Sequence, residues 1–353
     1  MSRKISRSFI NGRTGAGTAG QGIKVEWDST NDGELHWLDV SESSLEAVVD
    51  GDIAVYSGVF NSYVDTMDYI TITSTGNATD FGNMTVGKDS CATTANGGNG
   101  RGLHFMGRLS GGTETNIIEY ITINTPGNAT DFGDCSSATY NASACSNGIN
   151  DRGVVSLGII TDGNDSNVLE YVTISSTGNA TDFGDMTVLC SYGGGTSNGI
   201  NDRGIILRGN STGGGVTFNN HIEYITISST GNSTDFGDLT EAKHGLSGTT
   251  SNGTSDRAVV GGGVNSSAKV NVIEYFTISS TGNATDFGDL SNTHKYVGAA
   301  SNGTGDRAVW SGGFDATVNV MEYVTISSTG NATDFGDSTA SGMSQGVSNA
   351  GGN

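Results

Sequence analysis

The sequence predicts an all-β protein, and three observations support that prediction. The 353 residues include 56 glycines and one proline, and the glycines lack the every-third-residue period of collagen. Short runs rich in Thr, Ile, Val and Tyr alternate with turns rich in Gly, Asn, Ser and Thr. The motif GNATDFG occurs six times, with Ser233 replacing Ala in one copy. A motif repeated at near-constant intervals is a structural unit rather than a single catalytic element.

The repeat has a period of about 51 residues. In every unit a Tyr that follows an acidic residue lies 11 residues before the Asp of DFG. From that Asp to the next Arg the distance is 21 or 22 residues, and from that Arg to the next Tyr it varies between 16 and 21. Each unit therefore has one segment of constant length, one nearly constant and one variable. The tyrosines are Tyr69, Tyr120, Tyr171, Tyr224, Tyr275 and Tyr323.

Each unit divides into four short runs. In the fifth unit these runs are residues 244–253, 257–263, 271–278 and 284–290. The second and third are apolar on both faces and rich in β-branched residues, which is typical of inner strands packed between neighbouring sheets. The Asn, Gly, Ser and Thr residues between the runs favour tight turns. Six units of four strands predict a six-bladed β-propeller.

The order of these strands resembles the kelch repeat, which has a diglycine after its second strand, a Tyr on its third and an aromatic residue on its fourth. The fourth-strand aromatic is Phe here rather than the usual Trp, and several units keep only one Gly of the pair. The resemblance covers about residues 50–353 and implies the same propeller fold. The matching residues in the last two units are Gly262, Gly263, Tyr275, Phe287, Gly312, Gly313, Tyr323 and Phe335.

The two ends of the chain predict how the ring closes. Residues 50–58 align with residues 255–263, which places Asp52 where other units have Arg. The first unit then lacks its innermost strand, and the residues after Asp334 are expected to supply it. A ring closed in this way leaves no unpaired sheet edge. We therefore expect an N-terminal extension over residues 1–48, with a small β element, and a propeller over residues 49–353.

The repeated residues are expected to have structural roles. The Phe of DFG should pack between blades, its Gly should allow a bend, and its Asp should accept N–H groups of a turn. The Asn and Thr of the NAT triplet should bind the turn backbone rather than carry a glycan. The Arg that opens the second strand is expected to pair with the Glu that precedes the repeated Tyr. The six phenylalanines are Phe81, Phe132, Phe183, Phe236, Phe287 and Phe335.

The charge pattern limits the partners. The formal net charge is −21, which disfavours nucleic acid and anionic membranes as partners of the bulk surface. No signal-peptide core and no long apolar run is present, so we expect synthesis in the cytoplasm and no membrane insertion. The four cysteines are out of register with the repeat and are expected to be free thiols, with a Cys135–Cys145 bridge as the alternative.

The N-terminal segment differs from the rest in composition. Residues 1–25 carry basic residues and no acidic ones, and residues 22–27 and 34–40 are strand-like. This segment is expected to attach the propeller to a larger assembly, the alternative being a solvated terminus. The candidate attachment residues are Arg3, Lys4, Arg7, Arg13, Trp27 and Trp37.

Nothing in the sequence nominates an active site. The five histidines lie apart from one another and from cysteines at metal-ligand spacing, and no G-x-S-x-G element or kinase motif set is present. We expect a protein without enzymatic activity, cofactor or metal. Ca²⁺ held by clustered aspartates is the one ion left open, although no D-x-D-x-D-G loop occurs.

The variable segments point to one face of the ring. The turns between strands one and two and between strands three and four share a face, and their sequences repeat. The loops between strands two and three and the crossings between blades share the opposite face, and these vary. Rigid scaffolds carry recognition on variable loops, although a lack of constraint would also produce variation. The candidate contacts there are Tyr63, Tyr140, Tyr192, Phe218, Tyr296 and Phe314.

The repeated GNATDFGD resembles repeats of tail-fibre-like virion proteins of marine bacteriophages. That resemblance implies a virion structural protein in several copies per particle, attached to other virion proteins by the N-terminal segment. The loop face would then recognise a host surface receptor, with a glycan as one candidate. The alternatives are a capsid or tail decoration or connector protein that binds other virion subunits, and a carbohydrate-active enzyme.

Overall fold

The computed structural model describes residues 24–27, 35–38, 51–210, 217–314 and 319–350. The chain divides into two units, residues 1–49 and 50–353. In the first unit, β1 (Lys24–Trp27) and β2 (Leu35–Leu38) form an antiparallel pair in which Val25 lies opposite Trp37. Arg3, Lys4, Arg7 and Arg13 lie outside the described residues, so the attachment role of the first unit stays a prediction.

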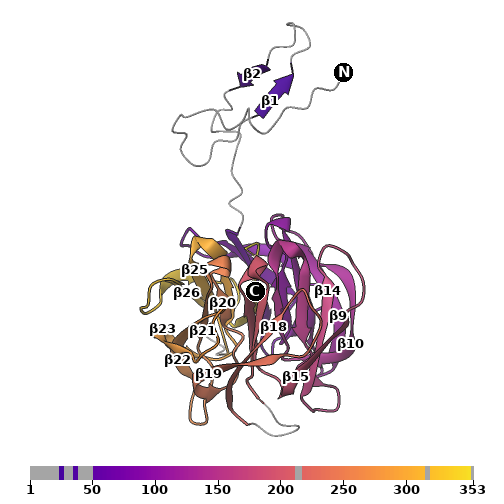
Figure 1. The fold of residues 1–353 in the computed structure, drawn as a ribbon, viewed down its shortest axis with the longest axis vertical. Helices are drawn as coiled ribbons and strands as arrows, with labels where there is room; N and C mark the ends of the chain where they lie inside the picture. Colours follow the sequence, from indigo (N-terminus) through magenta and orange to yellow (C-terminus); the bar gives the residue numbers. More distant parts are fainter. Residues whose placement is uncertain (1–23, 28–34, 39–50, 211–216, 315–318, 351–353) are drawn as a thin grey trace. The chain divides into compact units, whose positions relative to one another are not determined.

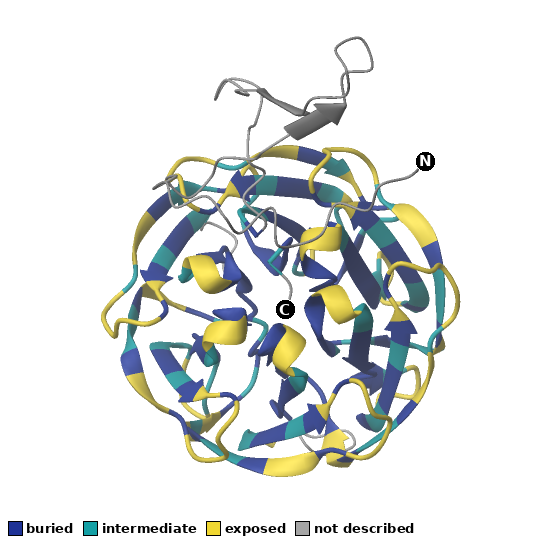
Figure 2. Ribbon diagram, turned by 45° about the horizontal axis from the view of Figure 1, so that its top comes forward, coloured by how far each residue is buried: buried dark blue, intermediate teal, exposed yellow. Residues whose placement is uncertain are grey.

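The second unit is a ring of six antiparallel sheets, or blades, which confirms the six-bladed propeller (Figures 1 and 2). Blade 1 consists of β28 (Met343–Ser348), β3 (Ile53–Val59), β4 (Thr66–Thr71) and β5 (Thr79–Asn83), from the axis outward. Blade 2 consists of β7 (Ala92–Ala95), β8 (Arg101–Leu109), β9 (Glu114–Thr122) and β10 (Thr130–Tyr140). The short strand β6 (Lys88–Asp89) adds to β8, and β13 (Ile159–Ile160) adds to β10.

The other four blades follow in chain order, each listed from the axis outward. Blade 3 is β11 (Ser143–Ser146), β12 (Arg152–Ser156), β14 (Ser166–Thr173) and β15 (Thr181–Cys190). Blade 4 is β16 (Gly194–Ser197), β17 (Arg203–Leu207), β18 (Asn219–Thr226) and β19 (Thr234–Lys243). Blade 5 is β20 (Thr249–Ser251), β21 (Arg257–Gly261), β22 (Val270–Thr277) and β23 (Thr285–His294). Blade 6 is β24 (Gly298–Ser301), β25 (Arg307–Ser311), β26 (Val320–Thr325) and β27 (Thr333–Asp337).

The ring closes in blade 1 as predicted, with one correction of register. The C-terminal strand β28 runs antiparallel to β3 and pairs Met343 with Val59 and Ser348 with Ala54. However, Ile53 lies opposite Thr71 as Arg257 lies opposite Thr277, so Ile53 and not Asp52 occupies the place of the repeated Arg. Asp52 instead corresponds to the Asp before that Arg, because it accepts hydrogen bonds from the N–H and hydroxyl of Thr73.

The GNATDFG motif joins each blade to the next. In all six copies the side-chain oxygen of its Asn accepts the N–H that follows the DFG glycine of the preceding blade, at 3.0–3.1 Å. The glycine leaves room for this turn: a Cβ on Gly237 would lie 2.3 Å from the carbonyl oxygen of Gly282. The aspartates of DFG are exposed, so the expectation that they hold the turn was wrong, and Asn does so.

The phenylalanine of each motif lies in the core between blades. All six are 2–3% exposed, and each meets the repeated Tyr of its own blade edge to face, with ring centres 6.0–6.4 Å apart. Burial of such large rings is the main source of stability for an interface of this kind. The four cysteines are also buried and free, which confirms the first of the two expectations for them.

The face with the repeated turns, here called the turn face, carries one polar network. Short 3-10 helices connect the first and second strands of blades 2–6 and surround the axis on this face (Figure 2). In the same blades the Arg lies 4.2–4.5 Å over the ring of the repeated Tyr and donates to a carbonyl of the next blade. The expected Arg–Glu pairs are therefore replaced by stacking, because the Glu side chains point into the core.

Candidate recognition site on the loop face

The loop face, formed by the second-to-third loops and the blade crossings, carries a continuous group of rings that we call the aromatic belt. Phe218 stacks on His244 with ring centres 5.2 Å apart, and His244 lies 5.2 Å from Tyr192. Tyr192 lies 5.9 Å from Tyr296, which stacks on Phe60 at 4.5 Å. The belt continues from Phe60 directly to Phe314, and through Arg108 to Tyr63 and Tyr140.

Phe314 and a central arginine complete the belt. Phe60 meets the ring of Phe314 edge to face at 5.0 Å. The guanidinium of Arg108 lies 5.8, 5.7 and 5.3 Å from the ring centres of Phe60, Tyr63 and Tyr140. The ammonium of Lys295 lies over Phe314 at 4.8 Å. Cations above ring faces stabilise such groups by about 0.5–1 kcal/mol at exposed positions.

The belt includes all six residues that the sequence nominated, and their binding role stays a prediction. Sequence reasoning missed Phe60, Arg108, His244 and Lys295, which lie in the same loops and crossings. Phe60 lies three residues before the nominated Tyr63, and His244 directly precedes Gly245. Their position in the variable loops and crossings was therefore the available signal. None of these six nominated binding residues lies on the turn face.

A ring of left-handed residues supports the belt from below. One residue of each crossing has a positive φ, and the six equivalent residues are Gly342, Ser90, Asn141, Tyr192, Gly245 and Tyr296. Backbone hydrogen bonds of 2.8–3.1 Å run from one to the next between Ser90 and Tyr296. Tyr192 at φ 55° and Tyr296 at φ 56° hold a conformation that disfavours side chains by about 1–2 kcal/mol. The surrounding bonds fix the backbone from which both rings project.

Arg108 is held by carboxylate and amide groups. It pairs with the buried Asp89 at 3.1 Å and donates to the amide oxygen of Asn61 at 2.8 Å. Burial alone would lower the pKa of Arg108, but the hydrogen bonds and charge of Asp89 outweigh burial and raise it. Arg108 therefore stays charged and fixes the loop of blade 1 against blade 2.

Three titratable rings of the belt, those of His244, Tyr192 and Tyr296, are uncharged at neutral pH. Burial, with a smaller contribution from Lys295, lowers the pKa of His244 to about 4. Burial also raises the pKa of Tyr192 and Tyr296. The centre of the belt therefore presents neutral rings and phenol groups.

A ring of buried carboxylates lies beneath the loop face. In each blade the acidic residue before the repeated Tyr accepts the backbone N–H of a Ser or Thr of the preceding blade, as Glu274 does from Thr240 at 2.7 Å. Burial opposes ionisation of Glu119, but Lys88, His104 and hydrogen bonds outweigh it and lower its pKa. The six acidic residues are Asp68, Glu119, Glu170, Glu223, Glu274 and Glu322.

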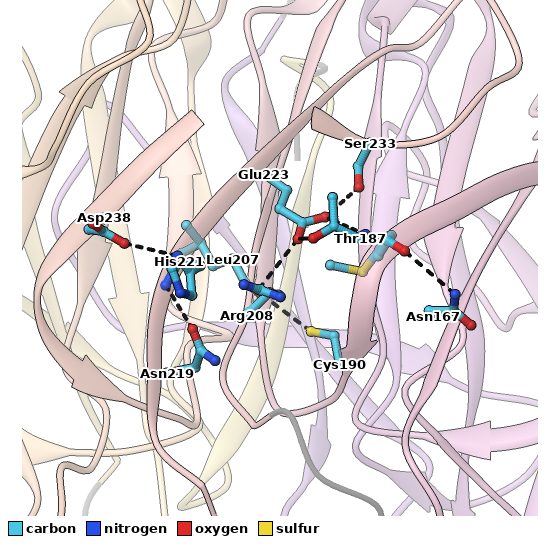
Figure 3. A network of polar contacts seen from close by, with 11 residues as sticks. Asn167, Thr187, Cys190, Leu207, Arg208, Asn219, His221, Glu223, Ser233 and Asp238 are labelled. Carbon is cyan, nitrogen blue, oxygen red and sulfur yellow. Dashed lines mark hydrogen bonds and ion pairs between the residues drawn. The ribbon is translucent and has the colours of Figure 1, made fainter. Parts of the chain in front are cut away.

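The cationic partners of these carboxylates differ between blades. Lys88 pairs with Glu119 and Lys243 with Glu274, both at 2.9 Å and with fully buried side chains. Figure 3 shows Glu223, which instead meets Arg208 at 3.4 Å and accepts hydrogen bonds from Thr187 and Ser233. The single Ser among the six NAT triplets thus has a specific partner. This layer makes the base of the belt rigid.

The axial channel is too narrow to be the binding site by itself. Its middle is lined by small residues of all six inner strands and holds about 30 Å³ of space, enough for one or two water molecules. Across the described ranges, no group of three His, Cys, Asp or Glu side chains is placed to hold a metal ion. Within the same ranges, no helix has the length and apolar character needed to cross a bilayer.

Comparison with known proteins supports the fold alone. No model of a known protein family matches the chain, and no curated protein matches its sequence. Among solved structures, that of the bacterial protein YjhT is similar, with a TM-score of 0.61 and 11% sequence identity. The similarity covers 81% of this chain and 95% of YjhT. At this identity the likeness shows a shared propeller and carries no statement about activity.

Proposed function

We propose that this protein is a non-enzymatic virion component whose loop face binds a receptor on the host surface. The observation that carries the proposal is the aromatic belt. Loops and crossings that differ in sequence bring Tyr63, Tyr140, Tyr192, Phe218, Tyr296 and Phe314 together on one face. Tyr296 is buried and the other five rings are partly exposed. Grouped aromatic side chains at a surface are the usual centres of binding energy.

The support beneath the belt favours binding without rearrangement. Positive-φ tyrosines, bridged by backbone hydrogen bonds, hold the rings in place before any ligand arrives. A surface ordered in advance loses less conformational entropy on association. The belt is built of rings rather than of a paired acid and base, which is why we propose recognition instead of catalysis.

The virion assignment rests on the resemblance of the GNATDFGD repeats to tail-fibre-like proteins. In this proposal the N-terminal segment attaches to other virion proteins, and several copies of the chain act together. Modest affinity at one loop face then becomes strong attachment of the whole particle. Nucleic acid and lipid bilayers are not part of the proposed partners.

The test compares matched variants of the full-length protein on intact host cells. Tyr63→Ala with Tyr140→Ala removes two belt rings, and we expect binding about 100-fold weaker. The control, Ile149→Ala with Ile200→Ala, removes two turn-face side chains that are 58% and 50% exposed, and should bind like wild type. Equal binding by both variants would reject the loop face as the receptor site.

An image of the intact particle distinguishes the alternatives. A loop face directed outward supports the receptor-binding proposal. A loop face buried between virion subunits would favour the decoration or connector function, and turnover lost on changing one unique carboxylate would favour the enzyme.

A further inference from the structure

We infer that the ligand of the loop face is a neutral saccharide, and that one of its hydroxyl groups enters a small hollow at the centre of the aromatic belt. This inference rests on the proposed function and names the ligand class for the same face. The hollow lies between the belt and the axial channel. Its lining includes the rings of Phe60, Tyr192 and Tyr296 and the polar residues Ser90, Asn141 and Ser247.

The hollow contains hydroxyl groups that need a partner. Ser90 is 3% exposed, and its hydroxyl has no hydrogen-bond partner in the described part of the chain. The hydroxyl oxygen of Ser247 is likewise buried and without a partner there. A buried polar group without a partner costs about 1–3 kcal/mol, so a water molecule or a ligand atom is expected to fill this place.

The size of the hollow selects the group that enters. Its space is about 20 Å³, which fits one water molecule or one hydroxyl group. A planar carboxylate or a tetrahedral sulfate has several heavy atoms and is too large. A hydroxyl of the ligand can replace the water and reproduce its hydrogen bonds, so the exchange favours binding.

The charge around the hollow favours a neutral ligand. No charged side chain lines the hollow among the residues that the structure places. Residues 50–353 hold 11 basic and 30 acidic residues, so the propeller has a formal net charge of −19. Two cations lie beside the rings that line the hollow: Arg108, which is paired with Asp89, and Lys295, whose ammonium lies 5.1 Å from the ring centre of Tyr296. An acidic saccharide would approach against the net negative field of the propeller, and the group that entered the hollow would meet no charged side chain in its lining.

The rings around the hollow fit the apolar face of a sugar. A pyranose presents C–H groups on one face and hydroxyls at its edge. The belt offers ring surfaces at the rim and hydrogen-bonding groups at the centre, which matches that division. The structure thus provides a contact surface and a single defined polar anchor, which one hydroxyl of one docked sugar unit can occupy.

The experiment measures binding of the full-length protein to two matched pairs of oligosaccharides. Neutral agarose oligosaccharides are compared with sulfated carrageenan oligosaccharides, and neutral laminarin with acidic alginate. We expect binding to at least one neutral member and at least tenfold weaker binding to its acidic counterpart. Stronger binding to the acidic members would overturn the inference.

Variants of the hollow provide the second part of the test. Ser90→Ala and Ser247→Ala should each weaken saccharide binding about fivefold, because each removes one hydrogen-bonding group. Ser143→Ala is the matched control. Its hydroxyl is also buried and has no partner among the described residues, but Ser143 lines the middle of the channel and not the hollow. Unchanged binding by both hollow variants, or an equal loss in the control, would overturn the inference.

The outcomes separate this inference from the proposed function. If host cells bind through the belt while no saccharide binds, the ligand class is wrong and the receptor function stands. If belt variants leave cell binding intact, the proposed function itself fails. Melting temperatures of all variants, compared with wild type, distinguish a loss of binding from a loss of folding.

Discussion

The two faces of the propeller are built by opposite rules. On the turn face, nearly the same hydrogen bonds and Arg–Tyr stacks recur from blade to blade, and sequence identity between repeats follows from those bonds. On the loop face each blade contributes a different residue at equivalent places, as Ser90, Asn141, Tyr192 and Gly245 do at one crossing position. Residues that repeat from blade to blade are therefore the ones that hold the ring together. Residues that differ mark places where one blade has a role that the others lack.

The largest expected effect tests a buried ion pair beneath the loop face that departs from the repeat. Lys243→Met removes the cation that meets Glu274 and leaves a carboxylate buried without its charge partner. We expect a loss of about 3–5 kcal/mol in the free energy of unfolding, measured by urea denaturation. The double variant Lys243→Met with Glu274→Gln should recover most of it. A loss below about 0.5 kcal/mol in the single variant would show that the pair is not needed.

The next effect tests the repetition of the turn face. Gly237→Ala places a Cβ 2.3 Å from a backbone oxygen of the next blade, at φ 150°. We expect a loss of about 3 kcal/mol, since backbone of the adjoining blade must shift. Gly231→Ala is the control, because its φ of 157° is also unusual but its Cβ would meet no atom within 4 Å. Equal losses would show that backbone strain, and not contact between blades, explains the motif.

Acid is expected to weaken the loop side of the ring before the turn side. Burial lowers the pKa of His104 to about 4, below its ordinary value of 6.5. The unfolded chain therefore binds the proton more readily, and the stability present above pH 6.5 falls as the pH drops toward 4. The loss is on the order of 3 kcal/mol at most.

Hydrogen exchange measured across that pH range checks the location. Faster exchange should appear first in β8 and the crossings that contact His104 and His244. The variant His104→Gln should flatten the pH dependence. Uniform acceleration over both faces would contradict the expectation.

The smallest expected effect concerns the one blade whose turn face lacks the stacked Arg. Ile53 occupies the one place of six that lacks the stacked Arg. Ile53→Arg should place a guanidinium over Tyr69 and within reach of a carbonyl of blade 2. We expect a gain of about 0.5–1 kcal/mol in the free energy of unfolding, with no change in ligand binding. A loss would mean that the packing of Ile53 against the core outweighs the stack.

The six-bladed ring could be predicted from the sequence because the sequence repeats. Constant spacing between Tyr and DFG gave the strand number, and the shortage of a strand at one end predicted closure by β28. The one-residue error at Asp52 arose because Ile53 stands where the other units have Arg. The first unit therefore lacks the residue on which the alignment of the repeats depended. The sequence predicted that Asp makes the turn contact of GNATDFG, whereas in the structure Asn makes it. Both side chains can cap a turn, and only the approach of the next blade selects Asn.

The site was predictable only in part. Variable loops and their aromatic residues indicated the correct residues to examine, such as Tyr192 and Phe314. Nothing in the spacing indicated that Arg108 from blade 2 would reach Phe60 of blade 1, because that contact depends on how neighbouring blades are rotated. The buried pairing of Lys88 with Glu119, 31 positions apart, depends on the same geometry.

The pairing of β28 with β3 has a consequence for how the protein is made. A ribosome releases blades 2 to 6 in order, and each can assemble on the one before it as soon as it emerges. Blade 1 must wait with the inner edge of β3 bare until the final strand arrives. A chain that terminates early keeps that edge open, and a β28 segment from a second nascent chain can fill it. Each full-length chain has only one such strand, so a donor would leave its own β3 bare. Premature termination is therefore expected to yield chains that associate through an open sheet edge.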